Sequence, residues 1–134
     1  MIFDVPKPEH QEPRSTPRAE RERRIHEVLE QVNALDFAGA PVGQLSGGEQ
    51  QRLAAARALV FKPEWLFMDE ATASLDDVSE AAVYDALKRG LPGATMVSIG
   101  HRPALQKWHD RRLELQRAPG EVGRLVESAL PAPA

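Results

Sequence analysis

The sequence has no cysteine among its 134 residues. Disulfide bonds and cysteine-ligated metal sites are therefore excluded within this chain. It also lacks an apolar run of about 20 residues, the length that a transmembrane helix needs, and its first residues lack the apolar core of a signal peptide. From these absences we expect a soluble or peripheral chain.

An excess of charge of one sign is also missing. The 17 basic and 20 acidic residues leave a formal net charge of −3. This charge is too small to argue for binding to nucleic acid or to an anionic membrane surface, so we expect no nucleic-acid partner. The length and the hydrophobic fraction of 42% are sufficient for one small globular domain.

Two glycines stand at the start of a predicted helix. Ser46 and Glu49 form the Ser-x-x-Glu pattern of a capping box, directly before an alanine-rich run over 50–59 with strong helix propensity. A capping box alone indicates an ordinary helix start. Gly47 and Gly48 weaken the first helical turn, however, unless the backbone must let another group approach closely. Because free N–H groups and the positive end of the helix dipole face the space in front of Ser46, we favour a bound phosphate over a plain cap.

A pair of acidic residues follows the next predicted strand. The run Trp-Leu-Phe-Met over 65–68 is short and apolar, so it predicts a buried strand that delivers Asp69 and Glu70 at its carboxyl end. Open parallel sheets bind ligands at that edge. Taken alone, the pair would still be interpreted as the beginning of a solvated loop.

Together the two motifs resemble the ATP-binding cassette (ABC) ATPase family, and two further motifs follow in the family's order. The third motif departs slightly, because Ala73 precedes Ser74 where the family's usual order is Ser-Ala-Leu-Asp. Four motifs with this spacing make a strong signal over about residues 25–116. The matching residues are the signature sequence (Leu45, Ser46, Gly47, Gly48, Glu49 and Gln50), the Walker B strand (66–69) with the catalytic glutamate Glu70, the D-loop (Ser74, Leu75 and Asp76) and the switch-histidine loop (98–102) with His101.

The chain divides into three predicted parts. Residues 1–19 are rich in proline and charge and predict an irregular segment, residues 20–116 predict a partial ABC ATPase domain, and residues 117–134 predict a tail. Within the middle part, apolar residues recur at helical spacing over 20–35. An alternating pattern over 111–116 predicts a further short strand.

A β-α-β unit is predicted between the acidic pair and the histidine. Asp76 or Asp77 can cap a helix that ends before a Gly-Leu-Pro-Gly run, and residues 94–99 form a second strand parallel to the first. His101 then leaves the sheet at the same edge as the acidic pair. This adjacency is what a shared active site requires.

The resemblance implies an α/β fold, namely the carboxyl-terminal part of a P-loop NTPase (RecA-like) domain with a parallel sheet and a helical signature subdomain. It implies phosphoryl transfer from ATP to water across a head-to-tail dimer of two nucleotide-binding domains. Asp69 would bind Mg²⁺ through water, Glu70 would polarise the attacking water, and His101 would contact the γ-phosphate. The signature residues would close on ATP held by the partner, and Asp76 would link the two sites.

One family motif does not occur in these residues, the phosphate-cradling Gly-x-x-x-x-Gly-Lys-Ser/Thr. The strand before that loop and the family's loop glutamine are also missing, so we expect a fragment that is inactive alone. Gln50 and Arg52 would support the signature helix or, equally well, be surface polar groups.

Two functions from different classes remain. The first is the ATP-hydrolysing domain of an exporter, bound to a transmembrane domain at the cytoplasmic face of the plasma or inner membrane. The second is a non-catalytic module that offers its signature face to a complete cassette. Asp-Glu-Ala-Thr at 69–72 and Gly-His-Arg at 100–102 resemble exporter cassettes, and the latter resembles half-transporters of peroxisomes and their bacterial relatives that move long acyl chains or peptides. Both contexts argue against the DNA-repair and chromosome-maintenance ATPases.

Overall fold

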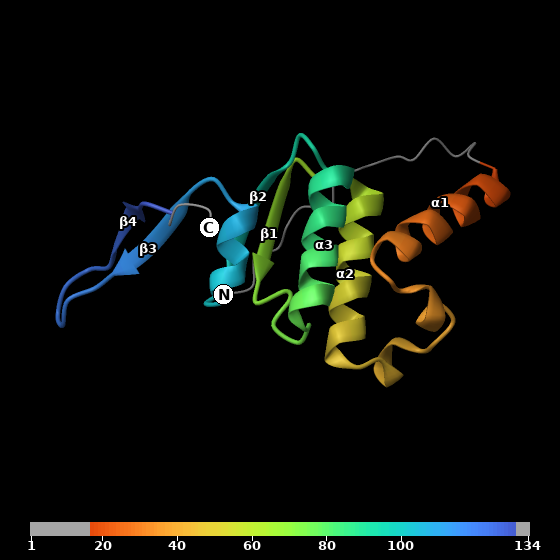
Figure 1. Cartoon of the computed structure of the whole chain (residues 1–134), viewed down its shortest axis with the longest axis horizontal. Coiled ribbons are helices and arrows are strands. Elements are labelled where there is room, and N and C mark those ends of the chain that lie inside the picture. The colour runs from red at the N-terminus through yellow and green to blue at the C-terminus, as the bar shows by residue number, and fades with distance from the viewer. Residues whose placement is uncertain (1–16, 131–134) are drawn as a thin grey trace.

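The computed structural model describes residues 17–130, so the expected irregular segment lies outside the described residues up to residue 16. The helices are α1 (Arg18–Gln31), α2 (Gly47–Phe61) and α3 (Asp77–Gly90), with 3-10 turns η1 (Leu35–Phe37), η2 (Val42–Gln44) and η3 (Pro103–Trp108). The strands are β1 (Trp65–Asp69), β2 (Thr95–Ile99), β3 (Arg112–Gln116) and β4 (Arg124–Ser128). Figure 1 shows an elongated arrangement with α1 at one end and the strands β3 and β4 at the other.

The strands β1 and β2 form a parallel pair that is joined by α3. Their register runs from Trp65 opposite Thr95 to Asp69 opposite Ile99. In Figure 1, α3 lies between β1 and α2, and α1 packs on the far side of α2. The predicted β-α-β unit with parallel strands is confirmed, and the chain is a mixed α/β structure consistent with the predicted class.

The hydrophobic core lies between the three helices and one side of β1. Apolar side chains spaced three or four residues apart share one face of each helix, which brings them into this layer. The most deeply buried apolar residues are Val32, Ala34, Ala56, Leu59, Val83, Tyr84, Ala86 and Leu87.

The opposite side of β1 is uncovered within the described residues, whereas the apolar run taken by itself predicts a buried strand. Side chains alternate between the two faces of a strand, so Met68 is 8% exposed whereas Phe67 is 70% and Trp65 59% exposed. The rings of Trp65 and Phe67 stack with their centroids 6.1 Å apart. Since the core helices pack on the Met68 side, the pair of strands is left with an apolar face that also includes Ile99.

The segment that follows β2 is fixed to α3 by one serine. The Ser98 Oγ lies 2.9 Å from the Tyr84 hydroxyl and 2.9 Å from His109 Nε2. The other ring nitrogen of His109 lies 2.9 Å from the carbonyl oxygen of Leu105, which can only accept, so Nδ1 donates. The Trp108 ring stacks on Tyr84 at 5.8 Å. These contacts hold the loop after β2 in place, and burial raises the pKa of Tyr84.

The first helix is confirmed but ends at Gln31, before the predicted end at residue 35, and Asn33 follows it with φ 53, a left-handed conformation that interrupts a helix. Ile25 belongs to the predicted apolar stripe but is 50% exposed.

Among residues 17–130, no helix combines the length and apolar character that crossing a membrane would require.

The strands β3 and β4 form an antiparallel hairpin. The predicted strand over 111–116 is confirmed as β3, whereas β4 lies in the stretch that the sequence predicts as a tail and was missed. Gly120 has φ 82 in the connection, and Arg111 donates two hydrogen bonds to the carboxylate of Glu127, at 2.8 and 3.0 Å. The strand β4 is short and partly charged, so its pairing with β3 rather than its own composition defines it.

Candidate active site

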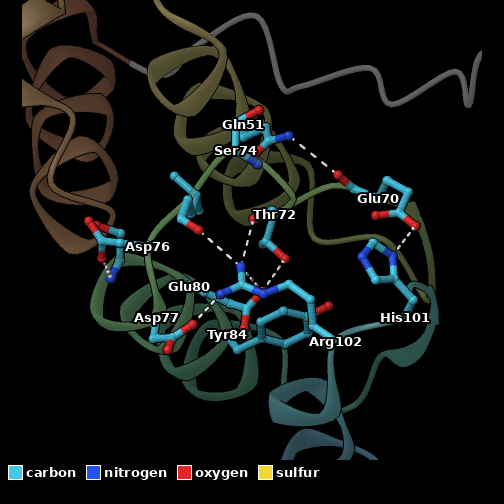
Figure 2. A network of polar contacts seen from close by, with 12 residues as sticks. Gln51, Glu70, Thr72, Ser74, Asp76, Asp77, Glu80, Tyr84, His101 and Arg102 are labelled. Atoms are coloured by element: carbon cyan, nitrogen blue, oxygen red, sulfur yellow. Dashed lines mark hydrogen bonds and ion pairs between the residues drawn. The ribbon is translucent and has the colours of Figure 1, made fainter.

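Glu70 and His101 meet at the carboxyl edge of the parallel strands. The Glu70 N–H donates to the Ile99 carbonyl at 2.9 Å, which continues the ladder one residue beyond Asp69. The His101 Nδ1 then lies 3.1 Å from the Glu70 carboxylate (Figure 2). The predicted adjacency of the acidic pair and the histidine is therefore confirmed. The His101 side chain is 81% exposed and that of Glu70 46%, so a ligand can reach both.

The backbone at Glu70 turns sharply out of the strand. Its φ of 48 lies in the left-handed region that residues other than glycine rarely adopt.

An ionised carboxylate can only accept hydrogen bonds, so in the contact between Glu70 and His101 the Nδ1 of His101 carries the proton. The Nε2 of His101 is left for another group, and the Glu70 carboxylate keeps further acceptor positions.

Asp69 is exposed at the same edge as the last residue of β1. In phosphoryl-transfer sites, Mg²⁺ is held by one or two carboxylates together with waters and the phosphates of the substrate. A single accessible carboxylate beside Glu70 fits that donor set. Within residues 17–130, no group of three or more possible metal ligands gathers that could hold an ion on its own.

The signature helix α2 begins with a complete capping box, as predicted. The Ser46 Oγ accepts from the Glu49 N–H at 3.3 Å, and the Glu49 carboxylate accepts from the Ser46 N–H at 2.6 Å. The backbone hydrogen bond from Ser46 is the main reason that the pKa of Glu49 falls below its ordinary value of 4.5. The N–H groups of Gly47 and Gly48 occupy the first turn and have no acceptor inside the helix. A phosphate at these amides stays a prediction.

The two glycines pack closely against the chain's own D-loop. A Cβ atom at Gly48 would lie 3.2 Å from the Ser74 carbonyl oxygen and 3.2 Å from the Leu75 side chain. A Cβ atom at Gly47 would lie 3.0 Å from the Ser74 Oγ. The group that approaches the glycines closely is thus the loop after β1, a contact that the sequence analysis did not foresee.

Three polar residues of α2 hold the surrounding loops. Gln51 was not predicted as a site residue, yet its Nε2 donates to the Glu70 carbonyl at 3.3 Å and its Oε1 accepts from the Ser74 N–H at 3.0 Å. Gln50 Nε2 donates to the carbonyl of the buried Leu45 at 3.0 Å. The Arg52 guanidinium lies 5.2 Å from the centroid of the Phe37 ring. Together these four contacts support the loop before α2 and the loop after β1.

Asp76 caps α3, as one of the two predicted capping residues. Its carboxylate accepts from the Ser79 N–H at 2.7 Å, and this bond is the main cause that lowers the pKa of Asp76 below its ordinary value of 3.8. Figure 2 shows Asp76 apart from the Glu70 and His101 pair. The role of Asp76 in linking two sites stays a prediction.

Arg102 is a residue of the site region that the sequence did not predict. Its side chain reaches from the loop after β2 to the carbonyl of Leu75 and to the carboxylates of Asp77 and Glu80 (Figure 2). Glu80 is 1% exposed, although it is an acidic residue on a helix. The available signal was an arginine directly after the candidate site histidine and several acids at the start of α3.

The sequence is similar to known proteins over much of its length. The profile of the family described as ABC transporter matches residues 2–73. P-glycoprotein 14 of Caenorhabditis elegans is 46% identical in an alignment of 90 residues that covers 59% of this chain and 7% of that protein. An ATP-dependent lipid A-core flippase of Xylella fastidiosa is 40% identical over 115 residues, 78% of this chain and 19% of that protein. A methionine import ATP-binding protein of Thermobifida fusca is 48% identical over 88 residues, 63% of this chain and 27% of that protein. The chain therefore spans well under half the length of these relatives.

Proposed function

Because the chain belongs to the ABC transporter family, we propose that residues 20–116 are the carboxyl-terminal part of the ATP-hydrolysing domain of an exporter. ABC ATP-binding domains use ATP with Mg²⁺ and, in transporters, pair with a second such domain and with a transmembrane domain on the cytoplasmic side of the membrane. The observation that carries the proposal is the contact between Glu70 and His101 at the carboxyl edge of β1 and β2.

The residues at the carboxyl edge of β1 and β2 have different roles in phosphoryl transfer. Glu70 accepts a hydrogen bond from the attacking water and orients it, while the proton on His101 Nδ1 holds the Glu70 carboxylate in place. The Nε2 of His101 faces the γ-phosphate and can donate to it only when the ring carries a proton on both nitrogens. Asp69 would help to hold Mg²⁺ through water, and the bound ion would supply charge neutralisation at the phosphates. These roles are part of the proposal.

The signature end of α2 acts on the nucleotide of the second domain. Its residues Leu45 to Gln50 include Gly47 and Gly48, whose free amides and helix dipole suit an anion, and Ser46, whose own N–H already donates to the Glu49 carboxylate. The complete capping box fixes the direction of these amides before a ligand arrives. Because Ser74 and Leu75 of the D-loop pack against both glycines, closure of the signature on a phosphate would also act on the D-loop, which ends at Asp76.

The exporter class is the narrowest assignment that we propose. Similarity to a P-glycoprotein and to a lipid A-core flippase favours it, together with the Asp-Glu-Ala-Thr context at 69–72. The relatives named above do not support the narrower branch of acyl-chain and peptide half-transporters. The 134 residues lack the lysine-bearing phosphate loop, so we also propose that they do not hydrolyse ATP alone.

The test is hydrolysis in a completed domain. An amino-terminal half with a Walker A motif, taken from an ABC exporter, is fused to residues 20–116, and Mg²⁺-dependent ATP turnover is measured. Glu70→Gln should lower kcat by about 100-fold or more, the usual contribution of general base catalysis. Glu64→Gln removes the same charge from an exposed residue just before β1 and should not change it.

Two results would contradict this assignment. Turnover that survives Glu70→Gln, or that Glu64→Gln reduces equally, would remove Glu70 from the reaction. A fusion that binds ATP without turnover, while the 134-residue chain changes the turnover of a separate complete cassette, would favour the non-catalytic module instead.

A further inference from the structure

The side chain of Arg102 enters the D-loop segment, here defined as residues 72–77 (Figure 2). Its Nη1 donates to the Leu75 carbonyl at 2.9 Å and, in a longer contact, to the Thr72 carbonyl at 3.4 Å. Its Nη2 pairs with the carboxylate of Asp77. A planar guanidinium carries five N–H donors and can bond to several separate acceptors at once, whereas a lysine ammonium lacks this forked arrangement of donors. One side chain therefore holds the D-loop segment at three points.

A buried carboxylate completes the contacts of Arg102. The Glu80 side chain is 2% exposed and lies 3.0 Å from the Arg102 Nη1. The same carboxylate oxygen accepts from the Thr72 hydroxyl at 2.8 Å. A buried carboxylate is tolerated when a cation and hydrogen bonds satisfy it. Arg102 thus has two separable tasks, because it balances the charge of Glu80 and it orients the D-loop segment.

The position of Arg102 in the chain links this segment to the candidate active site. Arg102 directly follows His101, whose ring contacts Glu70, and its guanidinium holds Leu75 and Asp77, the two neighbours of Asp76. A displacement of the His101 loop by a bound phosphate would therefore be transmitted to both neighbours. We propose that Arg102 is a positioning residue that couples the His101 loop to the D-loop segment. The proposal rests on the function proposed above.

A pair of substitutions separates the two tasks. Arg102→Met with Glu80→Gln removes both charges, while the glutamine oxygen can still accept from Thr72. If Arg102 only balances Glu80, this double variant behaves like the wild type. The matched control is Arg89→Met with Asp85→Asn, which removes an exposed ion pair of 2.7 Å from α3, the helix that carries Glu80. Arg102→Lys is a second probe, because it keeps the positive charge beside Glu80 and loses the fork.

The first readout is amide hydrogen exchange in the 134-residue chain. The Leu75 N–H donates to the Thr72 carbonyl at 3.0 Å inside the D-loop segment. We expect its exchange to accelerate about tenfold in the double variant and in Arg102→Lys, since local opening becomes easier. Exchange in the core helix α2 should stay the same in all variants. Unchanged Leu75 exchange, or equal acceleration in the Arg89 control, would overturn the proposal.

The second readout is turnover of the fused domain. The double variant should lower kcat about tenfold or more with little change in KM for ATP, because misplacement of catalytic groups by about 1 Å can cost that much. Recovery of the wild-type kcat in the double variant would show that Arg102 only balances Glu80. If the wild-type fusion has no turnover, the proposed function fails, and Leu75 exchange still decides whether Arg102 positions the segment.

Discussion

Two neighbouring residues of β1 should respond very differently to the same substitution. Phe67→Thr acts on the uncovered face of the strand pair, and Met68→Thr acts on the core face. We expect Phe67→Thr to leave the chain folded and to weaken its self-association. Met68→Thr should unfold a substantial fraction of the molecules.

The magnitudes follow from the exposure of each side chain. Full burial of a phenylalanine side chain stabilises a fold by about 1.5–3 kcal/mol. Because Phe67 is 70% exposed, its burial contributes less than half of that free energy. The stack with Trp65 adds about 0.5 kcal/mol. The loss is therefore about 1 kcal/mol. Truncation of a buried methionine such as Met68 costs about 2–5 kcal/mol, and the new hydroxyl adds a desolvation cost. The difference of about 2 kcal/mol corresponds to a factor of about 30 in the folding equilibrium.

Two assays check this contrast. Urea denaturation followed by circular dichroism at low protein concentration gives the free energy of unfolding of each variant. Size-exclusion chromatography at high concentration gives self-association, which an exposed apolar face and unpaired strand edges promote. Equal destabilisation by both variants, or unchanged self-association of Phe67→Thr, would refute the inference that this face is uncovered.

Three further predictions concern the starts of the helices. Ser46→Ala should destabilise the protein by about 1 kcal/mol, measured by urea denaturation, because the cap of α2 is lost. Gly48→Ala should also destabilise the protein by about 1 kcal/mol, because crowding at the D-loop outweighs the gain in helix propensity. The control Gly43→Ala should not destabilise it, because the space around the Cβ position of Gly43 is open. The pKa values of Glu49 and Asp76 are lowered by folding. Their carboxylates therefore stabilise the fold above their unfolded-state pKa values, and this contribution is lost as the pH falls through the lower folded-state values, so the thermal midpoint should drop in acid below about pH 4.5.

Local patterns were sufficient to predict the elements around the site. The capping box at Ser46 and the cap at Asp76 depend on contacts within four residues, and both are present. The parallel pairing of β1 and β2 follows from a short strand, helix and strand in succession. These rules also predicted that Glu70 and His101 would share one edge, and the structure confirms it.

Features that depend on distant partners could not be predicted in this way. Arg102 lies 22 residues from Glu80 in sequence, and no local pattern states that the acid is buried and needs a cation. The strand β4 exists through its pairing with β3. The exposure of Phe67 depends on which elements cover the sheet, and only the absence of the family's preceding strand, not the apolar run itself, predicts it. The same limit applies to Gly47 and Gly48. Two glycines indicate that another group comes close to the backbone, but they do not show that this group is the D-loop.

The most direct test of the central claim is the ATP-dependent dimer of the fused domain. Glu70→Gln keeps the shape of the side chain and removes the charge that orients water, so ATP should stay bound and a dimer should persist in size-exclusion chromatography with ATP and Mg²⁺. Gly48→Asp should prevent the dimer, because its side chain starts against the Ser74 carbonyl and the Leu75 side chain and adds bulk and negative charge at the signature. A persistent dimer of Glu70→Gln and a monomer of Gly48→Asp is the predicted result. An ATP-trapped dimer of Gly48→Asp, or a Glu70→Gln protein that turns over ATP and dissociates like the wild type, would contradict the account.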